Sequence, residues 1–512
     1  MKTTKPNPVS HVFHAKTKII DLEEGGELII RLNENEAIEY GIAPMDKVSL
    51  IYEGKEYVLD ANLTHRYIDA HEVGIPKDVA QKYGIQAGEK VQVHFTQTSS
   101  VALDALKRVI KGKRDTKFTQ KDIEAIMKDI STNRFTDTLI TYFSALGFFR
   151  DSSDKEMYRM AKAMAEAGEM LHRDGIVADK HCMGGVPGNE TTMIMIPLLA
   201  SLGIKMPKTF SKAITTPAAT GECVSVLMDI SFSKPEIEAL VKKNNTCLVR
   251  GGGLDLAPAD EKLIKVAYPL SMQSYPRTIV SIMAKKYAMG INHSLIDIPV
   301  GPTAKVPDMK TAKRLKKRYE YVGKKLGMKV HVEITDALQP IGAGVGAVLQ
   351  VREVLRVLQQ HPSRPSDLEV KAIHLASKII ELVGMAKGKE AVKLAYGQLV
   401  SGEARKKMQT IIAAQHGKNP HIKSEDLDLA DHSKDILVSQ TGKVKGIDMK
   451  ALNLLARTLG APLDLKAGVF LHHKLGAQVK KGEKLFTIYA EEKAKIDLAV
   501  EFLKEKDIYI IK

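Results

Sequence analysis

Alternation of apolar and polar residues dominates the first hundred positions of the chain. Runs that alternate, or that gather β-branched residues, occupy positions 27–32, 47–52, 57–59 and 90–95. Such runs are typical of β-strands with one buried face. The pattern therefore predicts a β-rich domain over residues 1–97.

An internal repeat lies within this β-rich region. Residues 35–42 read Asn-Glu-Ala-Ile-Glu-Tyr-Gly-Ile and residues 78–85 read Asp-Val-Ala-Gln-Lys-Tyr-Gly-Ile, and a turn and a strand-like run follow each. Each copy predicts a short helix that a glycine ends, and then a strand. Two such copies indicate a pseudo-twofold β-barrel of the double-psi type.

The apolar spacing changes to a helical period after position 100. Three helices are expected, and they begin near Thr119, Thr136 and Asp154. The third is expected to carry its methionines as far as Met170, where helical spacing identifies them as core residues rather than cofactor ligands. We expect this helical domain to span residues 101–172, with residues from about 258–290 completing it.

Beyond the helical region, strand-like apolar runs alternate with helices and glycine-rich loops, as in an α/β domain. Runs 295–300 and 330–335 predict buried strands. We expect an α/β phosphate-binding catalytic domain over 173–415 with a mixed or parallel sheet. A polar stretch at 417–434 predicts a boundary before a C-terminal α+β domain over 430–512. The predicted fold class is therefore multidomain α/β.

The most informative segment for chemistry is a glycine-rich loop that begins at Lys180-His181. Residues 179–192 read Asp-Lys-His-Cys-Met-Gly-Gly-Val-Pro-Gly-Asn-Glu-Thr-Thr, and an apolar run follows. Glycines let the backbone approach an anion closely, and the amides at a helix start point at that anion. Lys180 adds a positive charge. A plain tight turn is the alternative interpretation, and the loop alone leaves both open.

A second polar loop follows one α/β crossover further on. Residues 210–221 contain four hydroxyls and a lysine before another predicted helix. Loops that follow adjacent parallel strands meet at the same sheet edge. Each hydroxyl taken alone could be a helix cap. Together the two loops predict a phosphate site formed by Lys180, Thr192, Ser211 and Thr220.

Several segments, taken in order, resemble the signatures of one enzyme family. The loop at Lys180-His181 is similar to the Lys-His-Ser-x-Gly-Gly-Val signature of pyrimidine-nucleoside phosphorylases. Ser281 and Lys285, which share a helix face, also match it, as do the runs 256–260 and 335–340. The segments 185–189, 213–217 and 298–305 resemble one branch of that family. That branch holds the archaeal AMP phosphorylases and long bacterial chains described as thymidine phosphorylases, and the resemblance covers nearly the whole chain.

The resemblance implies roles for individual residues. It implies a phosphate site at Lys180, Cys182, Thr192, Ser211 and Thr220. It implies nucleoside contacts from His181, Gly185, Lys212, Ala213, Ile214, Thr215, Thr216, Gln273, Ser281, Lys285 and Lys305. We expect His181 and Lys285 to be catalytic, because the departing base needs donors or positive charge.

Three positions depart from the pattern of the family. Cys182 stands where the pyrimidine enzymes have a phosphate-binding Ser, and a thiol is a weaker donor. Lys212 replaces the Arg that is usual in the AMP-type loop, so a bidentate grip is lost. Gln273 aligns with the Asp proton donor of the AMP enzymes, and an amide cannot supply that proton. The reaction is therefore better specified than the substrate.

We predict phosphorolysis of a pyrimidine nucleoside, with thymidine and phosphate giving thymine and 2-deoxyribose 1-phosphate. The alternative substrate is AMP or another nucleoside 5′-monophosphate, which would give ribose 1,5-bisphosphate. A transferase that uses phosphoribosyl pyrophosphate would need Mg²⁺ and an acidic pair that these loops do not offer. A nucleic-acid-binding protein or an inactive regulatory member of the family is the alternative from another class.

Composition and charge restrict the partners. The net charge of +15 suits nucleic acid, a membrane surface or an anionic substrate. The lysines are spread along the chain, which favours a solvated surface, so we expect neither a membrane nor a nucleic-acid partner. The expected partners are a small nucleoside or nucleotide and inorganic phosphate as co-substrate, without a cofactor or metal. A homodimer or larger homo-oligomer is expected.

The cysteines and the N-terminus indicate the compartment. The three cysteines are Cys182, Cys223 and Cys247, and an odd number without a paired motif is a poor disulfide framework. A reducing compartment fits this pattern. The first twenty residues carry no continuous apolar segment of the secretory type. We therefore expect a cytoplasmic protein.

Overall fold

A computed structural model describes residues 12–512 apart from a few short gaps. The gaps are residues 97, 114–115, 150, 173, 211–215, 252–255, 268 and 270–273, together with the side chains of 148 and 149. The chain divides into two compact units. Unit 1 is Met1–Gly168 with Ala257–Thr278, and unit 2 is Glu169–Leu256 with Ile279–Lys512. Both contain helices and strands, which confirms the multidomain α/β class.

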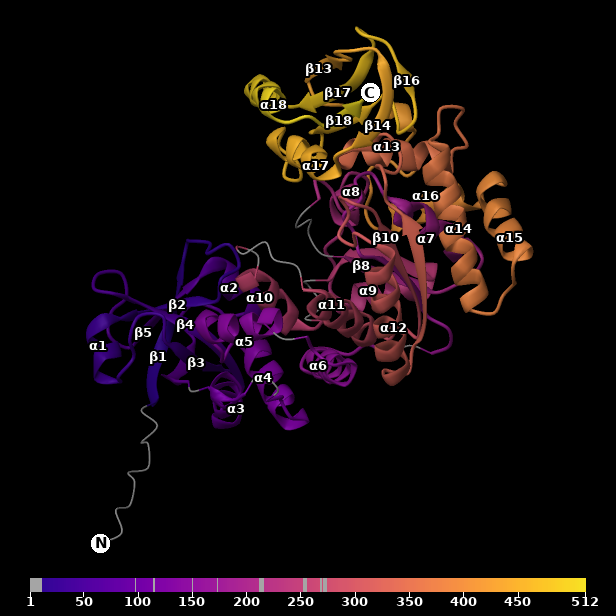
Figure 1. Cartoon of the computed structure of the whole chain (residues 1–512). Coiled ribbons are helices and arrows are strands. Elements are labelled where there is room, and N and C mark those ends of the chain that lie inside the picture. Colours follow the sequence, from indigo (N-terminus) through magenta and orange to yellow (C-terminus); the bar gives the residue numbers. More distant parts are fainter. Residues whose placement is uncertain are drawn as a thin grey trace. The chain divides into compact units, whose positions relative to one another are not determined.

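A closed β-barrel forms the first part of unit 1 (Figure 1). Its strands are β1 (Val12–Ile20), β2 (Ile29–Asn33), β3 (Lys47–Tyr52), β4 (Lys55–Thr64), β5 (Glu72–Pro76) and β6 (Lys90–Phe95). They close in the order β1-β5-β2-β4-β3-β6. The repeated motifs form the short helices α1 (Glu34–Glu39) and α2 (Lys77–Tyr83). Gly41 and Gly84 follow them with φ of 68° and 69°, a left-handed conformation that glycine adopts without strain.

Helices make up the rest of unit 1. They are α3 (Ser100–Lys111), α4 (Gln120–Ser131), α5 (Asp137–Phe149), α6 (Asp154–Glu166) and α10 (Pro258–Ala267), and α11 (Tyr275–Ala288) begins here. Thr119 caps α4 in a reciprocal capping box with Asp122. The expectation that the third helix carries Met170 is wrong, because α6 ends at Glu166 and Gly168, a poor helix former, follows its cap.

Parallel strands form the centre of unit 2. They are β7 (Ala178–Cys182), β8 (Met206–Phe210), β9 (Thr246–Arg250), β10 (His293–Val300) and β11 (Lys329–Asp336). One sheet has the order β11-β10-β7, and β8 pairs with β9. A parallel bridge between Val177 and Lys205 joins the start of β7 to the start of β8. The carboxyl ends of β7 and β8 therefore face the same edge, where ligands bind in open parallel sheets.

Helices cover this part of unit 2. They are α7 (Thr191–Ser201), α8 (Thr220–Ser225), α9 (Lys234–Asn244), α12 (Met309–Lys325), α13 (Ala347–Leu358), α14 (Ser366–Leu382), α15 (Lys389–Val400) and α16 (Glu403–Ala414), with a 3-10 turn η3 (Ser424–Asp426). Helix α7 is apolar on every face, which is the pattern of a helix without solvent contact. It packs against α13, α14, α15 and α16, and its core is continuous with theirs.

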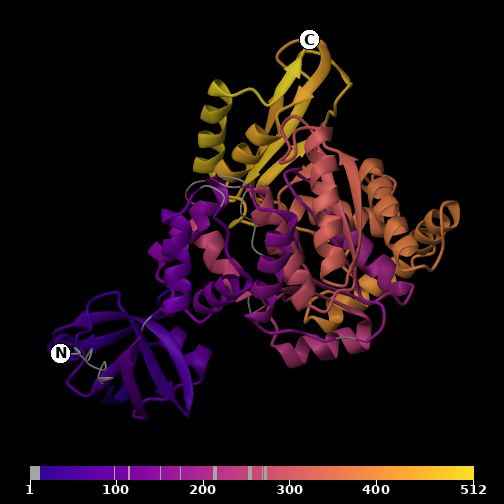
Figure 2. The same cartoon turned by 60° about the horizontal axis from the view of Figure 1, so that its bottom comes forward.

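The C-terminal part of unit 2 has two antiparallel sheets and its own core (Figure 2, yellow). Its elements are β13 (His432–Leu437), β14 (Gly442–Ile447), α17 (Met449–Thr458), β15 (Gly468–Leu471), β16 (Gln478–Val479), β17 (Lys484–Ala490), α18 (Lys493–Glu505) and β18 (Tyr509–Ile511). One sheet has the order β12-β15-β17-β13, and β12 (Gly344–Val345) comes from the segment before α13. This segment thus ties the second core to the first.

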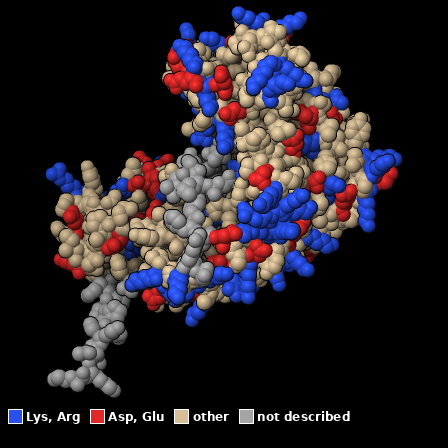
Figure 3. All heavy atoms as spheres, viewed as in Figure 1, with Lys and Arg blue, Asp and Glu red and all other residues tan. Residues whose placement is uncertain are grey.

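Basic residues gather on helix α12. Figure 3 shows several clusters of blue side chains on this face, one of them near the place where Figure 1 labels this helix. Six basic residues of α12 are exposed: Lys310, Lys313, Arg314, Lys317, Lys324 and Lys325. In the part of the chain that the structure describes, no helix combines the length and the apolar character that crossing a bilayer requires.

One buried carboxylate fixes the segment on which the glycine loop rests. Glu353 of α13 accepts hydrogen bonds from the backbone amides of Ala343 (2.9 Å) and Gly344 (3.0 Å). The Ile341 amide in turn donates to the Pro187 carbonyl at 3.1 Å. A Cβ on Gly188 would lie 2.2 Å from the Ile341 carbonyl oxygen, so glycine is required there. Helix α13 therefore fixes the segment that contacts the glycine loop of the candidate site.

Replacing Glu353 should destabilise unit 2. The Glu353→Ala variant leaves two buried amides without acceptors, and we expect a loss of about 2 kcal/mol. The Glu353→Gln variant keeps one acceptor oxygen and should lose less. Thermal unfolding followed by calorimetry measures both. Melting temperatures of both variants equal to that of the original protein would contradict this role.

Candidate functional site

Charged residues converge on the buried end of β7. Asp179 and Lys180 are each 1% exposed. Lys208 from β8 forms an ion pair with Asp179 at 3.2 Å, and Lys286 from α11 pairs with the other oxygen of the same carboxylate. Burial lowers the pKa of Lys208 to about 7, although Asp179 acts in the opposite direction. One carboxylate thus holds two amines beside the lysine that begins the glycine loop.

The amine of Lys180 is oriented by the first residue of helix α7. Its Nζ donates to Thr191 Oγ1 at 2.9 Å in a fully buried contact. Thr192, which the sequence motif points to as the phosphate ligand, lies next to it and is buried as well. Lys180 and the N-terminus of α7 therefore meet at the carboxyl edge of the sheet, as an anion site requires.

Glu190 also occupies this point, and the sequence reasoning gave it no role. The side chain is 3% exposed and lies directly before α7. The hydroxyl of Thr220 donates to its two oxygens at 3.1 and 3.3 Å. Burial raises the pKa of Glu190 to about 7, although Lys180 and Thr220 favour its charged form. Of the predicted phosphate ligands, Thr220 therefore contacts a carboxylate of the protein itself, and Lys180 lies close enough to affect its pKa.

His181 lies among amines. Removal from water lowers its pKa well below the ordinary value, and Lys286, Lys208, Lys180 and Lys285 act in the same direction. A histidine in this setting is neutral at neutral pH. It can donate one N–H hydrogen bond, but it is not an imidazolium acid.

Cys182 belongs to a second polar cluster at the end of β7. Its Sγ accepts hydrogen bonds from the Gly184 amide at 3.3 Å and the Asn189 side chain at 3.4 Å. Burial, followed by the charge of Asp297, raises the pKa of Cys182 to about 11, so the group is a thiol. Asp297 accepts from Thr335 at 2.6 Å and pairs with Lys371 at 3.5 Å. Burial raises the pKa of Asp297, but Lys371 and the other groups around the carboxylate together hold that pKa below its usual range.

The glycines of the loop make room for Lys305. Gly184 and Gly185 have φ of 79° and 90°, where a side chain is strained. A Cβ on Gly185 would lie 2.9 Å from both the backbone nitrogen and Cγ of Lys305. Burial lowers the pKa of Lys305, while Cys182 acts in the opposite direction. The close approach brings Lys305 and Cys182 to the same loop.

The structure brings together many of the residues that the sequence singles out. Lys180, Thr192, Thr220 and Glu190 lie around the start of α7, and Gly185, Cys182 and Lys305 lie along the glycine loop. Thr216, Ser281 and Lys285 are partly buried, and Lys285 is close enough to affect His181. Six predicted ligands lie outside the described residues. They are Ser211, Lys212, Ala213, Ile214 and Thr215 of the second loop, and Gln273.

Sequence reasoning missed the partners that hold these residues. Asp179, Lys208, Lys286 and Asp297 come from four separate elements, and no local motif links them. Glu190 lies within the glycine-loop motif, and its place directly before a run of ten buried residues was the signal that could have found it. A carboxylate at the start of a buried helix has to be accounted for.

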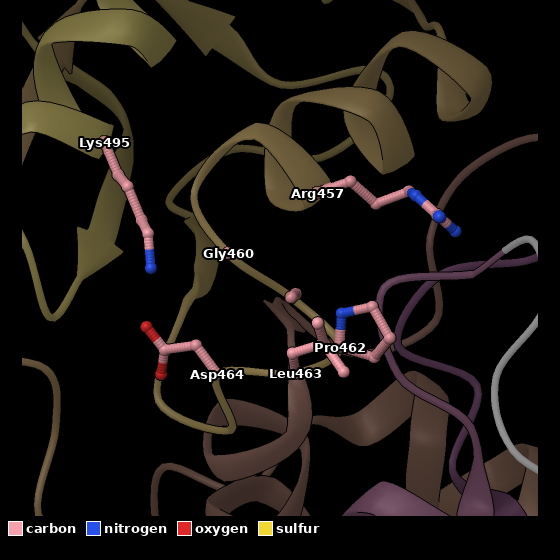
Figure 4. A pocket seen from close by; sticks show the side chains of 7 residues that line it. Arg457, Gly460, Pro462, Leu463, Asp464 and Lys495 are labelled. Carbon is pink, nitrogen blue, oxygen red and sulfur yellow. The ribbon is translucent and has the colours of Figure 1, made fainter. Parts of the chain in front are cut away.

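A cavity of about 710 Å³ lies elsewhere, in the C-terminal part of unit 2 (Figure 4). It is lined by Arg457, Gly460, Ala461, Pro462, Leu463, Asp464 and Lys495. Figure 4 shows the Lys495 amine facing the Asp464 carboxylate. None of the residues predicted for the candidate site lines this cavity, so the cavity is separate from the predicted phosphate and nucleoside contacts.

Part of the fold has a counterpart among solved structures. The anthranilate phosphoribosyltransferase of Thermus thermophilus is similar over 61% of this chain and 100% of its own, with a TM-score of 0.52 and 15% sequence identity. This likeness shows that part of the chain shares its architecture with that structure. At this identity it concerns the fold alone.

Sequence comparisons define the family. Residues 443–509 match the pyrimidine nucleoside phosphorylase C-terminal domain. An AMP phosphorylase of Pyrococcus furiosus is 39% identical over 490 residues, which cover 95% of this chain and 96% of that protein. A putative thymidine phosphorylase of Rhodopseudomonas palustris is 39% identical over 441 residues, covering 86% and 84%. The chain belongs to the pyrimidine nucleoside phosphorylase family, in the long branch shared with AMP phosphorylase.

Adding a methyl group at Gly185 should disturb the loop without unfolding the protein. The Gly185→Ala variant places Cβ against Lys305, and we expect at least a tenfold loss of phosphorolysis, since small displacements of reacting groups are costly. Gly175→Ala is the matched control, because Gly175 also has positive φ (77°) but has open space around it. Initial rates at saturating phosphate distinguish the two. Equal rates for both variants would show that the contact with Lys305 is unimportant.

Proposed function

We propose that the chain cleaves the N-glycosidic bond of a nucleoside or nucleotide with inorganic phosphate. The observation that carries this proposal is the buried Lys180 amine, which Thr191 orients at the N-terminus of α7 at the carboxyl edge of a parallel sheet. Thr220 contributes a hydroxyl to the same place. Amines, hydroxyls and helix amides together form a site for a tetrahedral oxyanion.

In the proposed reaction a phosphate oxygen forms a bond to C1′ of the sugar while the bond between C1′ and the base nitrogen breaks. The bonding electrons leave with the base, which becomes neutral when it takes up a proton. The transition state resembles an oxocarbenium ion, by analogy with glycoside hydrolysis. Lys180, Thr192, Thr220 and, in the proposed set, Ser211 and Cys182 hold phosphate in line with C1′.

We assign the stabilisation of the departing base to His181 and Lys285. Neutral His181 can donate an N–H hydrogen bond to an oxygen that gains negative charge as the bond to the sugar breaks. Lys285 adds a positive charge near the same imidazole. The remaining nucleoside contacts are proposed for Gly185, Ser281, Lys305, Gln273 and the loop 212–216. Because a neutral His181 donates without titrating, its hydrogen bond persists through neutral pH.

For the substrate we propose a pyrimidine nucleoside, with thymidine first. The matched domain is named for pyrimidine nucleosides, and several relatives are putative thymidine phosphorylases. Gln273, where the resemblance expects the Asp of AMP enzymes, also supports this choice. A nucleoside 5′-monophosphate is the second candidate. The observation in its favour is the AMP phosphorylase of Pyrococcus furiosus, whose match covers 95% of this chain.

A substrate panel separates the two candidates. Thymidine, uridine, AMP and CMP are each supplied with and without phosphate, and free base is measured by chromatography. We expect base release only with phosphate, and fastest from thymidine. Base release from AMP but from none of the nucleosides would show that the substrate is a nucleoside 5′-monophosphate. Intact substrates in every mixture that contains phosphate would refute the reaction itself.

Removing the amine of Lys180 tests the phosphate side. The Lys180→Met variant keeps most of the volume of a buried side chain, and we expect phosphorolysis to fall about 100- to 1000-fold, the usual effect of losing one preorganised electrostatic contact. Lys205→Met, which removes an amine from the surface near β8, is the control and should keep its activity. Rates and melting temperatures are measured together. A fully active Lys180→Met protein with unchanged phosphate KM would exclude Lys180 from the site.

A further inference from the structure

Glu190 lies beside groups that the proposed reaction assigns to phosphate. Thr220 donates a hydrogen bond to its carboxylate, and the positive charge of Lys180 stabilises the ionised form. The carboxylate therefore interacts with two of the groups that the proposed reaction assigns to phosphate. The side chain is 3% exposed and stands at the N-terminus of α7. A carboxylate and a phosphate compete for the same donors, because both are oxyanions that favour helix amides and amines.

Two anions cannot share such a buried place at low cost. Like charges a few ångströms apart in a poorly hydrated site disfavour each other's ionised form. A neutral carboxylic acid, by contrast, can accept a hydrogen bond from the hydroxyl of Thr220 and can donate a hydrogen bond from its own O–H to a phosphate oxygen. The protonated form of Glu190 is therefore compatible with bound phosphate, and the ionised form is not.

We propose that Glu190 is a proton-linked competitor for the phosphate site, so that binding of a tetrahedral dianion is accompanied by uptake of one proton on its carboxylate. The proposal deepens the phosphorolysis proposed above and rests on it. It makes Glu190 a residue that sets phosphate affinity as a function of pH. A cap of helix α7 with no influence on anions is the structural alternative.

The direction of the pH dependence follows from the groups around Glu190. Burial raises the pKa of this carboxyl to about 7, so below that pH it is neutral and does not compete. Above it the ionised form must take up a proton before phosphate binds, so affinity falls as pH rises. The charged and titratable neighbours are Lys180 on β7, Lys208 on β8 and Cys223 on α8. Burial keeps Cys223 a thiol, since its pKa is well above the ordinary value.

Lys208 is the neighbour that must be separated from Glu190. Burial lowers its pKa to about 7 as well, and loss of its charge would also weaken anion binding as pH rises. A variant that removes only the carboxylate keeps the effect of Lys208. The ratio of affinities between the original protein and Glu190→Gln therefore isolates the part that belongs to Glu190.

Sulfate is the suitable probe, because it stays a dianion where phosphate itself changes charge. Sulfate binding to the full-length protein, without nucleoside, is measured by titration calorimetry from about pH 6 to about pH 9, a range that spans the pKa of the carboxyl. The protein, Glu190→Gln and Glu222→Gln are compared. Glu222 is a matched control because it lies at the start of α8 and accepts the Ala219 amide at 3.0 Å.

The measured quantity is the sulfate dissociation constant of the original protein divided by that of Glu190→Gln. We expect this ratio to be constant below pH 7 and to rise about tenfold per pH unit above pH 7, as uptake of one proton requires. Glu222→Gln should follow the original protein at every pH. A ratio that stays flat across the range would overturn the proposal, and so would a failure of both proteins to bind sulfate at low pH.

These outcomes are distinct from those of the substrate panel. If the ratio rises but no nucleoside is cleaved, the anion site and its proton linkage stand and the proposed reaction fails. If cleavage depends on phosphate but the ratio is flat, the reaction stands and Glu190 is a structural cap. A Glu190→Gln protein with a lower melting temperature and a flat ratio likewise identifies Glu190 as a structural cap.

Discussion

The buried ion pairs of Asp179 are the interaction on which the candidate site depends. A lysine amine is taken out of water only at a cost of several kcal/mol unless a carboxylate and hydrogen bonds compensate it. Asp179 compensates two, Lys208 and Lys286, from different elements. Without it, the amines around His181 would repel one another in a poorly hydrated space. Its position directly before Lys180 on β7 couples this compensation to the glycine loop.

The same balance of charges recurs along the edge of the sheet. Asp297 on β10 is paired with Cys182 in the strand register, and it contacts Thr335 and Lys371. Glu190, at the start of α7, interacts electrostatically with Lys180. Each carboxylate thus has a basic neighbour from another element. In the proposed function this edge binds an anion, and in the further proposal the proton on Glu190 sets how strongly it does so.

Local patterns predicted many of the elements and the candidate residues of the site, whereas the contacts that hold those residues come from long-range pairing. Strands β3 and β6 have the bounds that their alternation indicates, and Thr119 begins its helix as its capping chemistry requires. Lys180 and Thr220 were predicted because glycines, hydroxyls and a helix start lie close to them in sequence. The motif pointed to Thr192, yet the structure gives the contact with Lys180 to Thr191, since the exact start of a helix decides which hydroxyl faces the strand. Lys208 and Lys286 reach Asp179 only through tertiary packing, which no local pattern encodes.

The central claim is that phosphate, rather than water, attacks the sugar. Phosphate fully labelled with oxygen-18 is incubated with the protein and its best substrate, and the sugar product is examined by phosphorus NMR and mass spectrometry. The account predicts a pentose phosphate that carries all of the label, including the oxygen that bridges carbon and phosphorus. Free sugar formed alongside unchanged labelled phosphate would contradict it, because that product arises from hydrolysis.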